Sequence, residues 1–327
     1  MTDRLSLALA AGAVALPEAG RVLLLRPPAD LALHGLPLDR IEVEHGFRPD
    51  HDALAARGLD VAPDRLGPAA AVVVFAPRAK ALALHMLARA VAMVGPGGPV
   101  LVDGAKTDGI DSILRRVRRD ARVGEVFAKA HGKCFAFAAP DPVPEGWTAR
   151  MGEADGFLTA PGVFSADGID PGSALLARHL DGLSGRVCDL GAGWGYLSVR
   201  ALERGAVTEC HLVEAEHAAL VCARRNVSDP RARFHWADAT RFDGGPFDAV
   251  VSNPPFHASR KADPALGRAF VAAAARLLAP RGRLLLVANR HLPYETALHD
   301  AFGTVTVLGD DGGYKVVEAS RPNRRPA

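Results

Sequence analysis

The sequence predicts an α/β protein made of two similar halves, each a mainly parallel sheet covered by helices. Short runs rich in Val and Leu alternate with longer segments of helical periodicity along all 327 residues. Strands that are apolar on both faces and separated by helices are typical of parallel sheets buried between helical layers. A proline-rich break at residues 140–146 (PDPVPEG) divides the chain. We therefore expect two domains, residues 1–145 and 146–327.

The apolar runs predict strands at residues 22–25, 71–75, 99–102, 187–190, 210–213, 248–252, 283–288 and 304–308. Helical patterns lie between them at residues 79–93, 108–119, 173–180, 196–204, 216–226 and 265–278. Before the first strand, Arg4 and the apolar residues 5–16 resemble a secretory signal. Asp3 weakens its positive start and no A-x-A cleavage site follows, so we expect a helix packed on the first domain.

Composition excludes several classes of protein. With 49% hydrophobic and 23% charged residues, the chain is not of the disordered, collagen-like or disulfide-rich type. No apolar run reaches the roughly 18–20 residues that cross a bilayer, so no membrane partner is expected. The four cysteines form no C-x-x-C pair, which indicates reduced, buried thiols and a cytoplasmic location. The 12 histidines lack metal-ligand spacing, so no metal site is expected.

The two halves match each other at three places in the same order. Residues 70–77 match 248–255, residues 97–102 match 281–286, and residues 131–135 match 312–316. Such ordered matches indicate duplication of one fold. The copies differ in chemistry, because Phe75 stands where the second half has Asn253 and nothing before residue 150 matches the glycine-rich turn described next. The first copy is therefore expected to be degenerate.

A glycine-rich turn follows the expected strand at 187–190. Gly191, Gly193 and Gly195 occupy alternate positions and precede a helix, a pattern that permits a tight turn and close approach of a ligand to the backbone. Glu214 closes the next strand, where a carboxylate suits ribose hydroxyls. Asp189, directly before the turn, would repel a pyrophosphate but attract an ammonium or sulfonium group. A purely structural turn is the alternative.

Asp238 follows the third strand of this half and is a candidate contact for an adenine amino group. A turn or helix-cap aspartate is the equally simple interpretation.

The segment Ser252-Asn253-Pro254-Pro255-Phe256-His257 directly follows the strand at 248–252. Its prolines restrict the backbone and hold the preceding Asn253 in an extended conformation at the carboxyl edge of the sheet, where open α/β sheets bind ligands. The Asn253 amide oxygen and the backbone carbonyl can accept both hydrogens of a planar NH₂ group, while the aromatic ring stacks on the attached base.

These motifs resemble class I S-adenosylmethionine-dependent methyltransferases. More closely, the chain is similar to the ribosomal RNA small-subunit methyltransferase C family, whose members are guanine-N2 methyltransferases with two related domains. The residues that carry this resemblance are Pro161-Gly162-Val163-Phe164-Ser165, Asp170 with Gly172-Ser173, Asn253 to His257, and Leu292-Pro293-Tyr294. The resemblance implies two tandem Rossmann-like methyltransferase domains, of which only the second binds S-adenosyl-L-methionine. Ala192-Gly193-Trp194 departs from the family's usual cysteine-containing loop and is expected to alter packing only.

The resemblance also implies roles for individual residues. For the cofactor, it places Gly191, Gly193 and Gly195 along the methionine portion, Asp189 near its amino group, Glu214 on the ribose, Asp238 and Ala239 around adenine, and Phe164 over the pocket. For the substrate, Asn253 and the Pro254 carbonyl would hold the target amine and Phe256 would stack on the base, with Pro255 and His257 beside it.

The expected function is methylation of guanine N2 in small-subunit ribosomal RNA by a monomeric enzyme. The chemistry of the site residues alone predicts only that the substrate has a planar NH₂ group, so adenine-N6 and protein-glutamine methylation remain alternatives. A non-catalytic RNA-binding protein and a nicotinamide oxidoreductase are the alternatives from other classes. The basic run Arg115-Arg116-Val117-Arg118-Arg119 is either a solvated helix face or a contact for phosphates.

Overall fold

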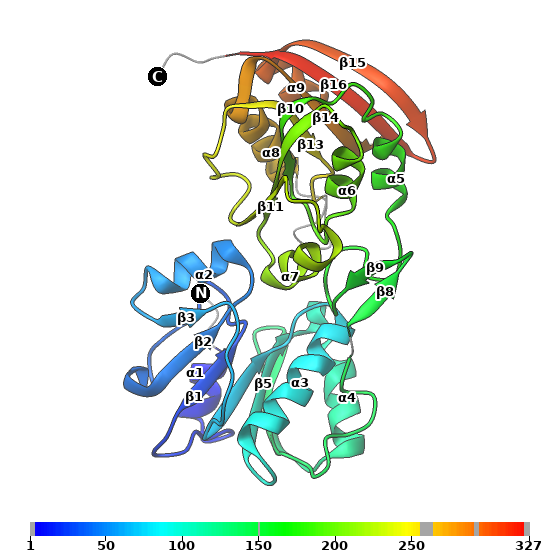
Figure 1. Cartoon of the computed structure of the whole chain (residues 1–327). Helices are drawn as coiled ribbons and strands as arrows, with labels where there is room; N and C mark the ends of the chain where they lie inside the picture. Colours follow the sequence, from blue (N-terminus) through cyan, green and yellow to red (C-terminus); the bar gives the residue numbers. More distant parts are fainter. Residues whose placement is uncertain (1–3, 150, 256–263, 291–293, 324–327) are drawn as a thin grey trace. The chain divides into compact units, whose positions relative to one another are not determined.

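The chain forms two compact units, residues 1–151 and 152–327, in a computed structural model that describes residues 4–149, 151–255, 264–290 and 294–323 (Figure 1). Each unit contains a seven-stranded sheet with helices on both faces. The expected α/β class is therefore confirmed.

The first unit has the strand order β3-β2-β1-β4-β5-β7-β6. Its strands are β1 (Val22–Leu25), β2 (Ile41–Glu44), β3 (Asp60–Ala62), β4 (Ala71–Phe75), β5 (Pro99–Ala105), β6 (Val123–Lys129) and β7 (Gly132–Ala138). Its helices are α1 (Arg4–Ala10), α2 (Arg48–Ala55), α3 (Lys80–Val94) and α4 (Ile110–Asp120). The first five strands pair in parallel, and β7 joins antiparallel to both β5 and β6.

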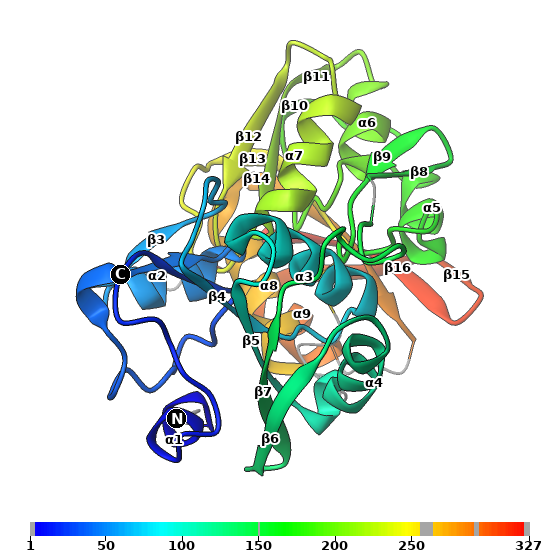
Figure 2. The ribbon, with the colours of Figure 1, turned by 90° about the horizontal axis from the view of Figure 1, so that it is seen from below.

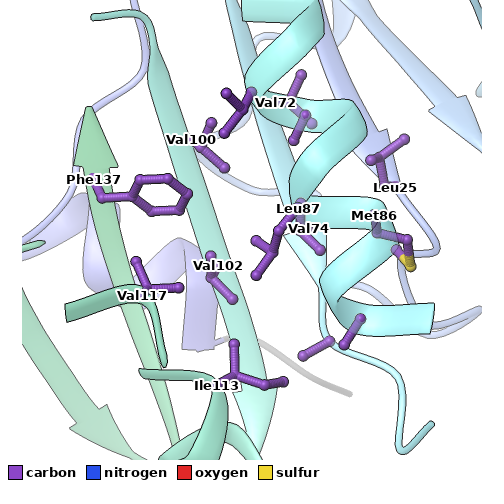
Figure 3. Close-up of a cluster of buried hydrophobic side chains, with 14 of the residues drawn as sticks. Leu25, Val72, Val74, Met86, Leu87, Val100, Val102, Ile113, Val117 and Phe137 are labelled. Atoms are coloured by element: carbon purple, nitrogen blue, oxygen red, sulfur yellow. The ribbon is translucent and has the colours of Figure 1, made fainter. Parts of the chain in front are cut away.

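Alternating side chains of these strands feed two separate cores, because successive residues of a strand point to opposite faces. Leu25, Val72, Val74 and Val102 pack against Met86 and Leu87 of α3 and Ile113 of α4 on one face (Figure 3). The other face receives α1 and α2 through Leu5, Ala8 and Leu54. Figure 2 shows α3 and α4 beside β5 and β7.

The second unit repeats this strand order as β12-β11-β10-β13-β14-β16-β15. The strands are β10 (Gly185–Leu190), β11 (Val207–Glu214), β12 (Ala232–Trp236), β13 (Phe247–Ser252), β14 (Leu278–Asn289), β15 (Phe302–Asp311) and β16 (Tyr314–Pro322). The helices are α5 (Pro171–Ala177), α6 (Tyr196–Leu202), α7 (His217–Asn226), α8 (Pro264–Leu277) and α9 (Glu295–Ala301). A small hairpin of β8 (Gly152–Ala154) and β9 (Phe157–Thr159) precedes α5.

The apolar segment at the start of the chain is a helix packed on the first unit, as expected, although it ends earlier, at Ala10. Arg4 is 4% exposed and forms a paired contact with Asp103, from Nε to Oδ1 at 2.7 Å and from Nη2 to Oδ2 at 2.9 Å. This buried ion pair ties α1 to β5. The four cysteines are buried free thiols, as the sequence predicts.

Among the residues described, no helix combines the length and the apolar character needed to cross a membrane.

Candidate active site

The predicted site lies at the carboxyl edge of the second sheet, where β10 and β13 are neighbours. Asp189 of β10 pairs with Val251 of β13, so the glycine-rich turn and Asn253 leave adjacent strands at the same edge. The Ser252 hydroxyl donates a hydrogen bond of 2.6 Å to the Leu190 carbonyl, which fixes the two strand ends to each other. The topology thus brings together two motifs that are about 60 residues apart in the sequence.

The three glycines of the turn all have positive φ, of +83° at Gly191, +55° at Gly193 and +94° at Gly195. L-residues other than glycine rarely adopt this region. The glycines differ in their surroundings, because a Cβ at Gly195 would lie 2.8 Å from Cγ2 of Val227 whereas one at Gly193 would meet nothing within 4 Å. Gly195 therefore serves close packing, and Gly193 leaves open space at the turn.

Glu214 holds the turn in place from the end of β11. Its Oε2 accepts a hydrogen bond of 2.8 Å from the Gly193 N–H, and its Oε1 accepts one of 2.7 Å from the Glu216 N–H. Burial raises the pKa of the Glu214 carboxyl. Since a carboxylate oxygen has two lone pairs, both oxygens keep acceptor capacity toward a ribose hydroxyl.

Asp189 is fully buried at the end of β10. Burial, followed by repulsion from Glu214, raises the pKa of its carboxyl to about 7. Oδ2 accepts a hydrogen bond of 2.6 Å from the Ser198 hydroxyl, and no donor to Oδ1 occurs among the described residues. The carboxylate thus lies beneath the turn, tied to α6.

Asp238 is occupied within its own turn. Its Oδ1 accepts hydrogen bonds from both the N–H and the hydroxyl of Thr240, at 2.8 and 2.7 Å. This is the turn role that the sequence left open as the alternative to an adenine contact. The neighbouring Ala239 is buried in the core against the second face of the sheet.

A small, partly open pocket lies beside the glycine-rich turn, at the edge of the sheet where Asn253 leaves β13. Four predicted site residues line it, namely Phe164, Gly191, Gly193 and Asn253. Seven other predicted residues that the structure describes lie outside its lining, namely Asp189, Gly195, Glu214, Asp238, Ala239, Pro254 and Pro255. The lining also contains seven residues for which the sequence predicted no role in the site: Ser165, Asp170, Ser173, Ala192, Trp194, Tyr196 and Leu197.

Asn253 has an amide whose orientation is fixed by two neighbours at the start of α5, the N-cap Asp170 and Ser173. Its Nδ2 donates to Oδ2 of Asp170 at 2.9 Å and to the Ser173 hydroxyl at 2.8 Å. An ionised carboxylate only accepts hydrogen bonds, so Asp170 requires the NH₂ side of the amide to face it. The Oδ1 atom is left buried and without a donor among the residues described. Buried polar atoms are normally paired, so this oxygen is poised for a donor supplied by a ligand.

Asp170 is held in place as the N-cap of α5. Its Oδ2 also accepts a hydrogen bond of 2.8 Å from the Ser173 N–H, and Pro171 occupies the first helical position. An Asp-Pro-x-Ser start before an apolar helix is a recognisable N-terminal signal in the sequence. No local sequence pattern shows that this cap also accepts a hydrogen bond from Asn253, which lies 83 residues later in the chain.

The loop Ala192-Gly193-Trp194, where the sequence departs from the family's usual pattern, is packed through its tryptophan. Trp194 is 4% exposed, and its Nε1 donates a hydrogen bond of 2.9 Å to the Phe164 carbonyl. Its ring contacts Phe157 with a centroid distance of 5.0 Å. Asn226 at the end of α7 donates to the carbonyls of Trp194 and Leu158, and so joins the turn to β9. Phe164 itself is 56% exposed at the mouth of the pocket.

Phe256 and His257 lie outside the described residues, so their predicted contacts with a base stay predictions. Pro254 is buried and Pro255 is exposed directly after Asn253. Within the described residues, no group of three or more His, Cys, Asp or Glu side chains is placed to hold a metal ion.

Comparison with known proteins identifies the family. A model described as the methyltransferase small domain matches residues 155–318. Ribosomal RNA small subunit methyltransferase C of Shewanella oneidensis is 31% identical over 257 residues, which cover 75% of each chain. The relative of the same name from Pseudomonas paraeruginosa is 32% identical over 269 residues, or 79% of this chain and 81% of that protein.

A solved structure is also similar over nearly the whole chain. It is that of the 16S rRNA N2 G1207 methyltransferase of T. thermophilus in complex with AdoMet and guanosine, with 26% sequence identity and a TM-score of 0.77. The similarity covers 94% of this chain and 90% of that one. With its glycine-rich turn, its pocket and its Asn-Pro-Pro segment on the second sheet, the chain belongs to the ribosomal RNA small subunit methyltransferase C family.

Proposed function

We propose that the protein transfers a methyl group from S-adenosyl-L-methionine to the exocyclic N2 amino group of a guanine in small-subunit ribosomal RNA. The observation that carries this proposal is the buried Asn253 Oδ1, oriented by Asp170 and Ser173 and lacking a donor among the described residues. It lies on the lining of the same pocket as the glycine-rich turn. The activity named for the relatives supports the choice of guanine N2 over other planar amines.

The residues present fit the cofactor. Gly191 and Gly193 line the pocket, and the open space beside Gly193 admits a ligand against the backbone. Glu214, which buttresses this turn, has lone pairs left for ribose hydroxyls. When bound, S-adenosyl-L-methionine supplies an activated methyl group on a positively charged sulfur, so the protein has no need of a strong base.

The protein's own contribution is to position the amine. Asn253 Oδ1 and the Pro254 carbonyl each accept one N–H of the target group, which directs the nitrogen lone pair toward the methyl donor. The same acceptors stabilise the positive charge that develops on nitrogen as the N–C bond forms. The surplus proton then leaves to solvent, because an alkylated aromatic amine is strongly acidic.

Methyl transfer from labelled S-adenosyl-L-methionine to small ribosomal subunits and to naked ribosomal RNA tests the proposal, with wild type beside Asn253→Ala. We expect N2-methylguanosine after digestion to nucleosides, and its loss in the variant while cofactor binding persists. N6-methyladenosine would refute the choice of guanine but keep the site. Absence of transfer to any RNA would refute the function and direct attention to protein substrates or to non-catalytic RNA binding.

We infer that residues 1–145 are a degenerate copy of the second domain, residues 146–327. The shared strand order supports this, as does a parallel at the second strand of each sheet. The Phe47 N–H donates to Nδ1 of His45 just as the Glu216 N–H donates to Glu214. Burial and then the charge of Arg26 lower the pKa of His45 to about 3, so its imidazole is neutral at ordinary pH. The first domain therefore lacks the carboxylate that Glu214 offers to a ribose.

The other two site positions are also altered in the first domain. Arg26, with φ of +52°, occupies the place of Gly191, and Phe75 occupies that of Asn253. We therefore expect one cofactor molecule per chain in calorimetric titration, and complete loss of binding in Gly193→Leu. A second binding event that survives this substitution would overturn the inference.

We further propose that the protein works as a monomer in the cytoplasm, since a duplicated domain can substitute for a partner subunit. Light scattering is expected to give a mass near the 34.4 kDa of one chain. A dimer at micromolar concentration would contradict this.

A further inference from the structure

Helix α4 of the first unit has an apolar stripe that fixes its rotation. Ile110, Ile113, Leu114 and Val117 follow the i, i+3, i+4, i+7 spacing of one helix face and are at most 3% exposed. Ile113 and Val117 point toward Val102 and Phe137 of the sheet (Figure 3). The opposite side of the helix must therefore face solvent.

Arginines occupy that opposite side. Arg115, Arg118 and Arg119 have the i, i+3, i+4 spacing, displaced by five residues, or about 140°, from the apolar stripe. All three are exposed, as is Arg122, which lies two residues beyond the end of the helix at Asp120. We call these four residues the α4 arginine surface.

The acidic side chains nearby are already occupied. Asp120 accepts hydrogen bonds from Nε of Arg116 and Nε1 of the buried Trp147, both at 2.8 Å, and one of 3.3 Å from Arg119. Asp111 forms an ion pair of 2.6 Å with Lys133. In the part of the chain that the structure describes, Arg115, Arg118 and Arg122 form no ion pair within 4.0 Å, although the charge of Arg115 is a minor contribution, after Lys133, to the lowered pKa of Asp111.

The helix dipole accounts for only part of this arrangement. Cations in the last turn of a helix are stabilised by its negative end, which fits Arg118 and Arg119. It does not account for Arg115, one turn earlier, or for Arg122, beyond the helix. The protein as a whole has a net charge of only +2, so three unpaired guanidinium groups on one surface form a local concentration of charge.

We propose that the α4 arginine surface binds the phosphate backbone of the RNA substrate; this rests on the proposed function. Guanidinium groups pair with phosphates through two parallel hydrogen bonds. Helix α4 (IDSILRRVRRD) contains no aromatic residue on which a base could stack. The contact is therefore with phosphates and independent of sequence, and the choice of guanine belongs to the other domain.

The test is a triple variant, Arg115→Gln/Arg118→Gln/Arg122→Gln, of the full chain. Binding to 16S ribosomal RNA is measured from 50 to 300 mM salt, together with methyl transfer. At physiological salt, we expect the affinity for RNA to fall by roughly 10-fold or more. The slope of log K against log salt should be reduced in magnitude by about 2–3. The KM for RNA should rise while kcat at saturating RNA is retained.

Two controls separate charge from folding. The matched variant Arg78→Gln/Lys80→Gln/Lys106→Gln removes three exposed cations from the same unit and should leave the slope nearly unchanged. The variant with lysine at positions 115, 118 and 122 keeps the charge and should recover most of the affinity. Unchanged cofactor affinity and an unchanged unfolding midpoint would show that the fold is intact.

Wild-type affinity and slope in the triple variant would overturn the inference, whatever the methyl-transfer result. So would a variant that loses binding only to anionic phospholipid vesicles, since the surface would then be a membrane contact. If wild type bound RNA through these arginines but methylated none, the inference would stand and the proposed function would fail.

Discussion

At the scale of single residues, the chemistry of Asn253 depends on which way its amide is turned. The two sides of an amide differ completely, since one donates and the other accepts. Asp170 determines the choice because a carboxylate can face only the NH₂ side, and the acceptor oxygen is then left for the substrate. We regard Asp170 as a positioning residue, one that acts through Asn253.

Asp170→Ser is therefore expected to lower kcat by about 10–100-fold, the effect of losing one charge-assisted hydrogen bond of roughly 1.5–3 kcal/mol. Serine keeps the N-cap of α5 but does not reach Asn253. Steady-state kinetics with separate measurement of cofactor affinity checks this. Asp170→Asn, whose amide oxygen can replace Oδ2, is the matched control and should stay within a few-fold of wild type. An equal loss of cofactor affinity in Asp170→Ser would mean that the pocket had been damaged instead.

A second prediction concerns the stability contributed by Asp189. Because its pKa is raised from 3.8 to about 7, the folded state binds the proton more tightly than the unfolded state. Protonation of Asp189 therefore contributes to the free energy of unfolding. The contribution is fully present below pH 4 and is lost as the pH rises through 7. Asp189→Asn removes the titration while keeping an acceptor for Ser198. Relative to wild type, its free energy of unfolding should be higher at pH 8 than at pH 5 by on the order of 1 kcal/mol or more.

Chemical denaturation at the two pH values measures this difference. Asp243→Asn, at an exposed position, is the control and should show none. A constant difference between wild type and Asp189→Asn across the range would contradict the prediction.

At the scale of elements, the glycines of the glycine-rich turn differ in function, because one serves the stability of the fold and another serves binding. Gly195 faces Val227, and Gly193 faces open space. Gly195→Ala must accommodate both a positive φ and a 2.8 Å approach, and we expect it to lower the free energy of unfolding by roughly 2–4 kcal/mol. Gly193→Ala meets no atom of the protein and should cost only about 1–2 kcal/mol, but weaken cofactor binding at least 10-fold. Thermal unfolding and calorimetry compare the two, and the reverse pattern would contradict the proposed position of the cofactor.

Elements with a fully buried apolar run could be predicted from the sequence, whereas several partly exposed ones were missed. The mostly exposed β15 is an exception, because a strand was expected at 304–308. The expected strands at 22–25 and 71–75 coincide with β1 and β4, because every residue in them is buried. The prediction missed β3 and the edge strand β6, whose residues are all exposed or half-buried. It also missed α2, in which only Leu54 is buried.

In the site, too, local motifs could be predicted and long-range contacts could not. The glycine-rich turn and Asn253 are contiguous motifs whose chemistry is visible in the sequence. The roles of Asp170 and Ser173 arise from long-range contacts to Asn253, which no local pattern records. For Asp238, one sequence pattern fitted both a turn and a ligand contact. The hydrogen bonds to Thr240 show the turn role, and the contact with adenine stays a prediction.

At the scale of the whole molecule, buried histidines make the fold sensitive to acid. The folded-state pKa of His45 is lowered from 6.5 to about 3 by burial and by Arg26, so its contribution is present above pH 6.5 and is lost as the pH falls toward 3. Burial lowers the pKa of His85, His211 and His235 in the same direction. Several such groups combine to favour unfolding in acid.

His45→Asn retains an acceptor for the Phe47 N–H but removes the titration. We expect its free energy of unfolding to fall less steeply than that of wild type between pH 6.5 and 4.5, by up to about 1.4 kcal/mol per pH unit. Denaturant titration at several pH values measures both slopes. His131→Asn, at an exposed position, should keep the wild-type slope, and parallel slopes for all three proteins would argue against the role of His45.

The order of the strands has a consequence for biosynthesis. In each sheet the strand made last, β7 or β16, lies between the two made before it. While the polypeptide grows, β15 has no neighbour in the sheet until residues 314–322 have been synthesised. Tyr314, the first residue of β16, also lies against α5, since a Cβ at Gly172 would come within 2.9 Å of its ring. The helix that begins after Asp170 and carries Ser173 is therefore supported by the strand of its sheet that is synthesised last, and the reactive pocket is completed only after β16 has left the ribosome.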